Sequence, residues 1–146
     1  MLVIAVGVVG AAVLTGVLVW RWATPPALPQ GASPAMVART YFELDSAGRS
    51  WAAMHYVLRT GGLDEPNGRS YGGSHLVRVS KVYPQSKQDY ASRYDSLAQL
   101  CGVTISYRRT RTDEVGNPPG DYDTFVLLGR ATRAGPWRVV YIGDPL

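Results

Sequence analysis

Hydrophobic and polar positions divide the chain into an apolar start and a longer polar part. From Leu2 to Trp20 there is no charged residue, and Thr15 carries the only hydroxyl. A helix of about 20 apolar residues, rising about 1.5 Å per residue, spans the roughly 30 Å hydrocarbon core of a bilayer. The pattern predicts a transmembrane anchor over residues 1–22, with residues 2–20 in the membrane.

The alternative for this segment is a cleaved signal peptide. The apolar run is longer than the usual signal core of about 7–15 residues, and no basic residue precedes it. Cleavage after Ala23 or Ala27 would also leave Arg21 or Pro25 where a small residue is required. We therefore expect an uncleaved anchor. Arg21 follows the span, and the positive-inside rule applied to this single charge favours a cytoplasmic domain.

Residues 23–33 contain three prolines and a glycine before the first amphipathic segment. Such a composition is typical of a stiff, extended spacer. We expect it to hold the following domain, residues 34–146, away from the membrane.

Two short amphipathic helices are predicted next. Ser33 and Pro34 form a helix start, Val37, Tyr41 and Leu44 share one face, and Gly48 can end the helix. Ser50 is expected to begin a second helix whose apolar face is formed by Trp51, Met54, Val57 and Leu58. Together they predict an αα-hairpin.

The second half alternates as β-strands do. Strands are predicted over 76–83, 103–108, 122–130 and 137–141, with Trp137, Val139 and Tyr141 on one face of the last. A glycine-rich loop is expected over 60–75 and a short helix around 91–100. Helices followed by a strand meander predict an α+β fold, with the hairpin packed on the concave face of a curved antiparallel sheet.

Two stretches carry a resemblance. ARTYFELDSAGRSWAAMHYVL (38–58) resembles the opening of the nuclear-transport-factor-2-like superfamily, whose fold is an α+β cone. VTISYRRTRTDEVGNPPGDYDTFVLLGRATRAGPWRVVYIGDP (103–145) is similar to an uncharacterised branch of membrane-anchored proteins and lipoproteins of Gram-positive bacteria. The chain departs from that pattern in its glycine-rich loop and in lacking a lipid-attachment cysteine. The resemblance implies a domain outside the cytoplasm at the plasma membrane.

Composition excludes several classes of function. The net charge of +4 comes mainly from scattered arginines, which does not favour nucleic-acid binding. Cys101 is the only cysteine, so no disulfide framework is possible, and we expect it to be buried. His55 and His75 lack a third ligand, so we expect no metal and no cofactor.

Candidate site residues fall into two groups. An open cone would have an aromatic ligand cavity, and the candidates for its lining are Tyr41, Trp51, Tyr56, Tyr107, Trp137 and Tyr141. Arg108, Arg109 and Arg111, with Arg130 and Arg133, are expected around one end of the sheet, where they could contact an anionic partner. Asp121 or Asp123 could instead pair with Arg108 or Arg111 across the hairpin.

Carboxylates suited to catalysis are not evident. Asp64 and Glu65 lie in the polar loop, where they are expected to be solvated, and Asp45 is expected to cap a helix or to be solvated. These features predict a non-catalytic single-span envelope protein that binds a partner protein or a small ligand. The alternatives are a cone-fold isomerase or dehydratase, and a subunit of a secretion or conjugation assembly that oligomerises through anchor and domain.

Overall fold

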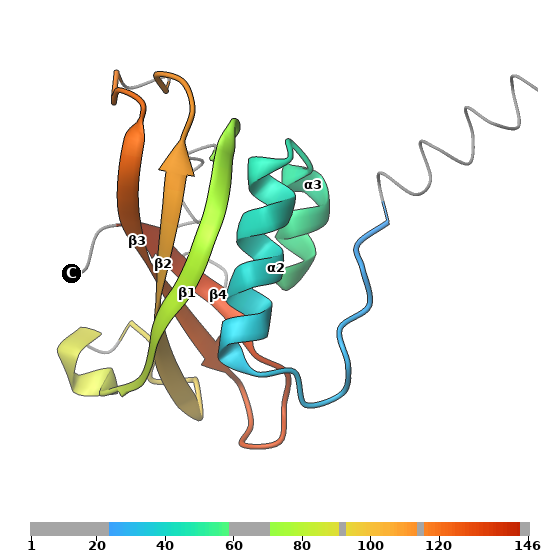
Figure 1. Ribbon diagram of the computed structural model, residues 1–146. Helices are drawn as coiled ribbons and strands as arrows, with labels where there is room; N and C mark the ends of the chain where they lie inside the picture. The colour runs from blue at the N-terminus through green and yellow to red at the C-terminus, as the bar shows by residue number, and fades with distance from the viewer. Residues whose placement is uncertain (1–23, 59–70, 91–92, 114–115, 144–146) are drawn as a thin grey trace, which may run out of the picture.

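The computed structural model of the chain describes residues 24–58, 71–90, 93–113 and 116–143. Their elements, in chain order, are α2 (Pro34–Ser46), α3 (Ser50–Ala53), the 3₁₀ turn η1 (Met54–Tyr56), β1 (Ser74–Gln85), the 3₁₀ turn η2 (Lys87–Tyr90), β2 (Gln99–Arg109), β3 (Gly120–Arg130) and β4 (Arg138–Gly143). The strands form one antiparallel sheet in the order β1-β2-β3-β4. The sheet curves around the helices, which confirms the predicted α+β class (Figure 1).

Helix α2 begins and ends as the sequence predicts. The Ser33 hydroxyl accepts a hydrogen bond from the Met36 amide at 3.3 Å, and Pro34 occupies the first helical position. Just beyond the helix, Gly48 adopts φ 74°, a left-handed conformation that favours glycine. One face of α2 is buried against the sheet and consists of Val37, Ala38, Tyr41, Phe42, Leu44 and Asp45.

The second helix is shorter than predicted, and its predicted apolar face is wrong at Trp51. Val57 leaves the helix to form a parallel bridge with Val139, and the Leu58 amide donates to the Val139 carbonyl at 2.8 Å. This pairing with β4 ends the helix early. The buried residues of this segment are Ala52, Ala53, Tyr56 and Val57, and Met54 packs against the same core. Trp51, predicted to face the core, is 69% exposed.

The segment before β2 also differs from the prediction. Residues 93–96 form turns and Gln99 already lies in β2, so the helix expected around 91–100 is wrong in its described part. The Ala98 amide donates to the Arg130 carbonyl at 2.8 Å, which extends pairing with β3. Leu97 is buried beside Leu100 of β2.

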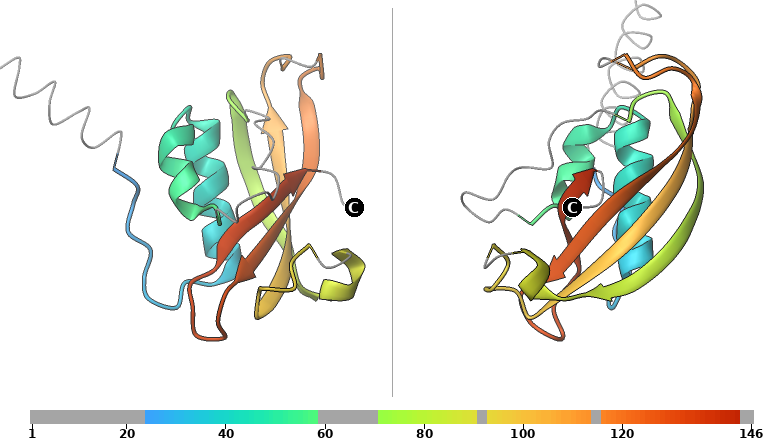
Figure 2. Two further views of the ribbon diagram at one scale, coloured as in Figure 1. Left: turned by 180° about the vertical axis from the view of Figure 1, so that it is seen from behind. Right: turned by 90° about the vertical axis from the view of Figure 1, so that its left-hand side faces the viewer.

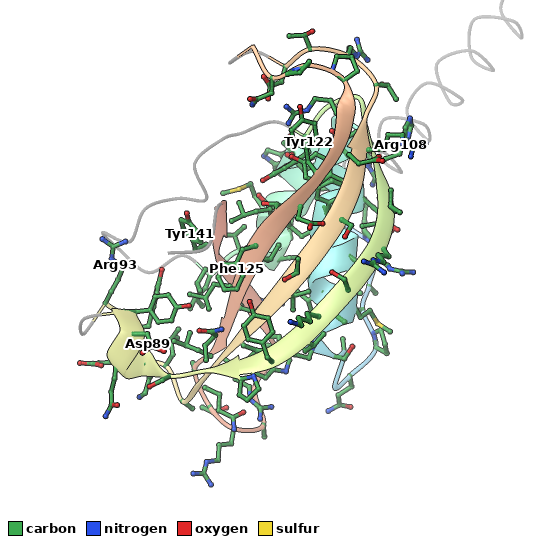
Figure 3. All side chains as sticks on the ribbon, turned by 60° about the vertical axis from the view of Figure 1, so that its left-hand side comes forward. Asp89, Arg93, Arg108, Tyr122, Phe125 and Tyr141 are labelled. Atoms are coloured by element: carbon green, nitrogen blue, oxygen red, sulfur yellow. The ribbon has the colours of Figure 1, made fainter. Side chains whose placement is uncertain are left out.

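Apolar side chains cover both faces of the sheet. The concave face packs against α2 and α3 through residues that include Val103, Ile105, Val126 and Val139. Part of the opposite face is covered by the segment around η2, with a second core of Tyr94, Leu97, Leu100, Phe125, Leu127 and Val140. Figure 2 (right) shows the sheet curving around the helices, and Figure 3 shows Phe125 on the face turned away from them.

A register shift in β4 breaks the predicted alternation of the last strand. Tyr141 pairs with Leu127 and Val139 pairs with Leu128, so Val140 is an extra residue on β4. Such a bulge changes which face the following side chains occupy. Val139 therefore belongs to the concave core, whereas Tyr141 packs against the second core on the other face.

Residues 24–32, which we call the strap, pack along the domain. The Arg49 guanidinium donates to the Thr24 carbonyl at 2.9 Å, and the Tyr56 hydroxyl donates to the Pro26 carbonyl. Leu28 and Ala32 pack against the concave core. The described part of the predicted spacer is thus attached to the domain over most of its length.

Two predictions concern residues outside the described ranges. The expected anchor falls on residues 1–23, and Asp64 and Glu65 of the glycine-rich loop fall on 59–70. Within the described ranges, no helix has both the length and the apolar character needed to cross a bilayer.

Candidate functional site

The six aromatic residues predicted to line one cavity lie in four separate places. Tyr41 and Tyr107 are buried in the concave core, each 6% exposed. Tyr56 and Trp137 line a groove beside the strap. The remaining two are Trp51, on the outer side of α3, and Tyr141, on the opposite face of the sheet (Figure 3).

Aromatic rings fill the concave side of the sheet near the end of α2. The Phe42 ring centroid lies 4.9 Å from that of Tyr71 and 5.2 Å from that of Tyr107. Tyr107 stacks in turn on Tyr122 at 5.8 Å. Offset and edge-on pairs at these separations are favourable packing geometries. The predicted cavity residue Tyr107 is therefore part of a packed aromatic cluster.

Asp45 is buried, contrary to the expectation of a solvated or capping residue. It is 6% exposed, and its carboxylate accepts hydrogen bonds from the Tyr71 amide at 2.9 Å and the Ser50 hydroxyl at 2.6 Å. Burial, and then the nearby charge of Asp45, raise the pKa of the Tyr41 hydroxyl well above its ordinary value. The carboxylate thus links α2, α3 and the chain entering β1.

The three arginines predicted to meet an anionic partner have different surroundings. Arg108 forms an exposed, two-point ion pair with Asp121, at 2.7 and 3.0 Å, which confirms the predicted cross-strand pair. Arg109 is buried, pairs with Asp113 and lies 5.0 Å above the Tyr122 ring. Arg111 is exposed, with its side chain lying across Gly73.

Arg130 does not join this group. Arg109 pairs with Gly120 and Gln99 pairs with Arg130, so Arg130 lies at the other end of the same two strands. Ten residues of extended strand, at about 3.3 Å each, separate the two ends by about 33 Å. The predicted clustering of Arg130 with Arg108, Arg109 and Arg111 is therefore wrong.

A groove of about 560 Å³ runs between the strap and the turn joining β3 to β4, and we call it the strap groove. Figure 2 shows the strap, in blue, running down to this turn. The strap forms one wall, and the other residues that define the site are His55, Tyr56, Arg130, Trp137 and Arg138. None of the described residues that line it is acidic.

Hydrogen bonds and ring contacts fix the cationic side of the strap groove. The Arg130 guanidinium lies 4.7 Å above the Trp137 ring and donates to the Gln99 amide oxygen at 2.6 Å. Arg138 is half-buried and donates to the Trp137 carbonyl at 3.4 Å, a weak hydrogen bond. Neither arginine forms an ion pair with any carboxylate in the part of the chain that the structure describes.

Tyr56 connects this cationic side to the strap. Burial raises the pKa of its hydroxyl, and the positive charges of Arg138 and Arg49 offset part of that rise. The phenol therefore stays protonated at neutral pH and donates to the Pro26 carbonyl. The groove accordingly presents two arginines and an aromatic ring beside an apolar, proline-rich wall.

Tyr56, Trp137 and Arg130 were predicted from the sequence, with Arg130 in a different group, and Arg138 was missed. Arg138 follows Trp137 directly and Arg130 ends the preceding strand, so both flank one hairpin turn. An arginine at each end of the connection between two antiparallel strands was a signal that could have placed them together. The packing of the strap could not be predicted, because its contacts with Arg49 and Tyr56 join segments distant in sequence.

Searches against protein-family models, curated proteins and solved structures give no match to this chain. The resemblance to the nuclear-transport-factor-2-like superfamily therefore stays a prediction. The described residues contain no group of three or more His, Cys, Asp or Glu side chains placed to hold a metal ion.

Proposed function

We propose that this chain is a non-catalytic, single-span protein of the bacterial envelope whose domain binds an acidic, extended segment of a partner protein in the strap groove. The uncharged run from Leu2 to Trp20 is long enough for one membrane span. Trp20 and Trp22 suit the interfacial layer. The sequence resemblance supports a position outside the cytoplasm.

The observation that carries the binding proposal is the positive charge of the strap groove, which no carboxylate of the described residues neutralises by an ion pair. Arg130 and Arg138 stand beside an aromatic ring, with no acidic residue among the described lining. Partly desolvated arginines bind carboxylates by charge-assisted hydrogen bonds, and the Trp137 and strap surfaces offer apolar contact. By contrast, Arg108 and Arg109 at the other end of the sheet already have carboxylate partners.

The buried charged side chains in the described residues, Asp45 and Arg109, support a binding function better than a catalytic one. A general base needs access to a substrate at hydrogen-bonding distance. Asp45 is occupied by Tyr71 and Ser50, and Arg109 by Asp113. These charged groups hold segments of the fold together, and Arg109 lies over the Tyr107 and Tyr122 rings.

A fluorescein-labelled peptide of glutamate and leucine residues tests the proposal, with the same peptide carrying glutamine in place of glutamate as its control. We expect the fluorescence anisotropy of the acidic peptide to rise as the detergent-solubilised full-length chain is added. The anisotropy of the glutamine control should not change. The double variant Arg130→Gln/Arg138→Gln should abolish the rise.

The matched control variant is Arg108→Gln/Arg111→Gln, which removes the same charge from the other end of the sheet. It should leave the affinity unchanged. An equal loss of binding in both double variants would show that binding depends on net charge and not on the strap groove, which would contradict the proposal. Absence of binding by the parent chain would also contradict it.

A further inference from the structure

Trp51 is a large apolar side chain on the surface of the domain. It is 69% exposed on the first turn of α3, and its ring meets the His55 ring edge-on at 5.5 Å between centroids. With Met54, His55 and Val57 it lines a hollow of about 460 Å³. Tryptophan is enriched where protein meets the headgroup layer of a bilayer, since its ring is both apolar and polar.

The strap places this surface close to the end of the proposed membrane span. Thr24 follows Trp20 by four residues, and four extended residues reach at most about 14 Å. The Arg49 guanidinium holds the Thr24 carbonyl at 2.9 Å, and Arg49 precedes Trp51 by two residues. The polar layer on each side of a bilayer is about 5–8 Å thick. If residues 2–20 span the bilayer, Thr24 lies within about 14 Å of the hydrocarbon core, and the start of α3 is tied to Thr24 through Arg49.

A second hydrogen bond keeps the helix in that place. Tyr56, at the end of η1, donates to the Pro26 carbonyl, so both ends of the α3–η1 segment are attached to the strap. A free proline-rich spacer would allow the domain to stand away from the membrane. A strap attached at Thr24 and Pro26 draws the domain toward the membrane.

We propose that α3 rests on the bilayer that holds Leu2–Trp20, with the Trp51 ring in the headgroup layer. This inference depends on the membrane span of the proposed function and adds a second contact between protein and lipid. It also sets the orientation of the domain, because the surface around Trp51 must face the membrane.

Lipid quenching of tryptophan fluorescence tests the contact in the full-length chain. The chain is reconstituted in phosphatidylcholine nanodiscs with or without bromine near the headgroup end of the acyl chains. Three single-tryptophan variants, made by Trp→Phe substitutions, retain Trp20, Trp51 or Trp137, and circular dichroism checks their folding. We expect brominated lipid to quench Trp20 and Trp51, and to leave Trp137, under the Arg130 guanidinium, unquenched.

The outcomes separate the two proposals. Unquenched Trp20 would contradict the membrane span itself. Quenched Trp20 with unquenched Trp51 would leave the span intact and overturn the contact of α3.

A second substitution in the variant that retains Trp51 tests the role of the strap. Arg49→Ala should reduce the quenching of Trp51 because the strap is released from the helix. Arg49→Lys, which keeps a hydrogen-bond donor, should retain most of the quenching. Unchanged quenching after Arg49→Ala would contradict the role of the strap.

Discussion

The carboxylate of Asp45 in α2 accepts a hydrogen bond from the backbone amide of Tyr71, which lies 26 residues later in the chain. Both groups are buried, and the Oδ–N distance is 2.9 Å. The second carboxylate oxygen accepts from the Ser50 hydroxyl at the start of α3. One side chain therefore fixes the helical hairpin relative to the segment that enters the sheet.

Loss of the Asp45 carboxylate should destabilise the domain strongly. Asp45→Ala leaves the Tyr71 amide buried without this acceptor, and a hydrogen bond to a charged group contributes about 1.5–3 kcal/mol. We expect the free energy of unfolding in urea to fall by about that amount. Asp45→Asn, which keeps one acceptor oxygen, should lose less. Equal stability of Asp45→Ala and the parent chain would show that the contact does not hold the hairpin.

Thr124 connects two further buried groups. Its hydroxyl oxygen lies 3.0 Å from the Tyr71 hydroxyl and donates to the Gly143 carbonyl at 3.2 Å. Thr124→Val has a similar shape but removes both hydrogen bonds, and we expect a loss of about 1–3 kcal/mol in unfolding free energy. Thr124→Ser should be closer to the parent. The double variant Tyr71→Phe/Thr124→Val should recover part of the loss, and no recovery would contradict the pairing.

The two ion pairs near the β2–β3 hairpin should differ greatly in their effect on stability. Arg109 and Asp113 have side chains 7% and 15% exposed, whereas Arg108 and Asp121 are 65% and 67% exposed. Asp113→Ala leaves a buried guanidinium without this partner, and we expect a cost of about 3 kcal/mol. Asp121→Ala should change the midpoint of thermal unfolding little. Similar decreases in the midpoint of thermal unfolding for Asp113→Ala and Asp121→Ala would contradict the difference in burial between the two ion pairs.

Alkaline pH should weaken the domain through Tyr41. Burial, followed by the charges of Asp45 and Tyr71, raises the pKa of its hydroxyl above the ordinary value of 10.0. Because the folded pKa exceeds the unfolded one, the stabilisation is complete below pH 10.0 and is lost as the pH rises through the folded pKa. One such group contributes a slope of about 1.4 kcal/mol per pH unit.

Tyr41→Phe removes this titration. Urea unfolding at several pH values above 10.0 should therefore show a shallower decline in the variant than in the parent chain. Parallel declines would contradict the buried state of the Tyr41 hydroxyl.

Local pattern predicts the fold where neighbours in sequence determine the structure. The Ser33–Pro34 start of α2 and the alternation of Val103, Ile105 and Tyr107 are confirmed. Cys101 is buried as expected, and burial raises the pKa of its thiol. These features depend on hydrogen bonds and burial within one element, which composition and spacing encode.

Prediction failed where tertiary contacts override local preference. Val57 leaves its helix because it pairs with Val139, and the bulge at Val140 moves Tyr141 to the other face. The binding groove depends on the strap, whose position is set by single hydrogen bonds from Arg49 and Tyr56 to backbone carbonyls. Carbonyl acceptors exist at every residue, so spacing alone does not identify these pairs.

The location of the domain is the central claim, and cysteine labelling in intact cells tests it most directly. Arg133 is exposed on the β3–β4 turn, and the native Cys101 is buried, so the parent chain provides an unreactive background. With Arg133→Cys we expect a membrane-impermeant maleimide to label intact cells, with no further gain after lysis. Labelling that occurs only after lysis would place the domain in the cytoplasm and contradict the account.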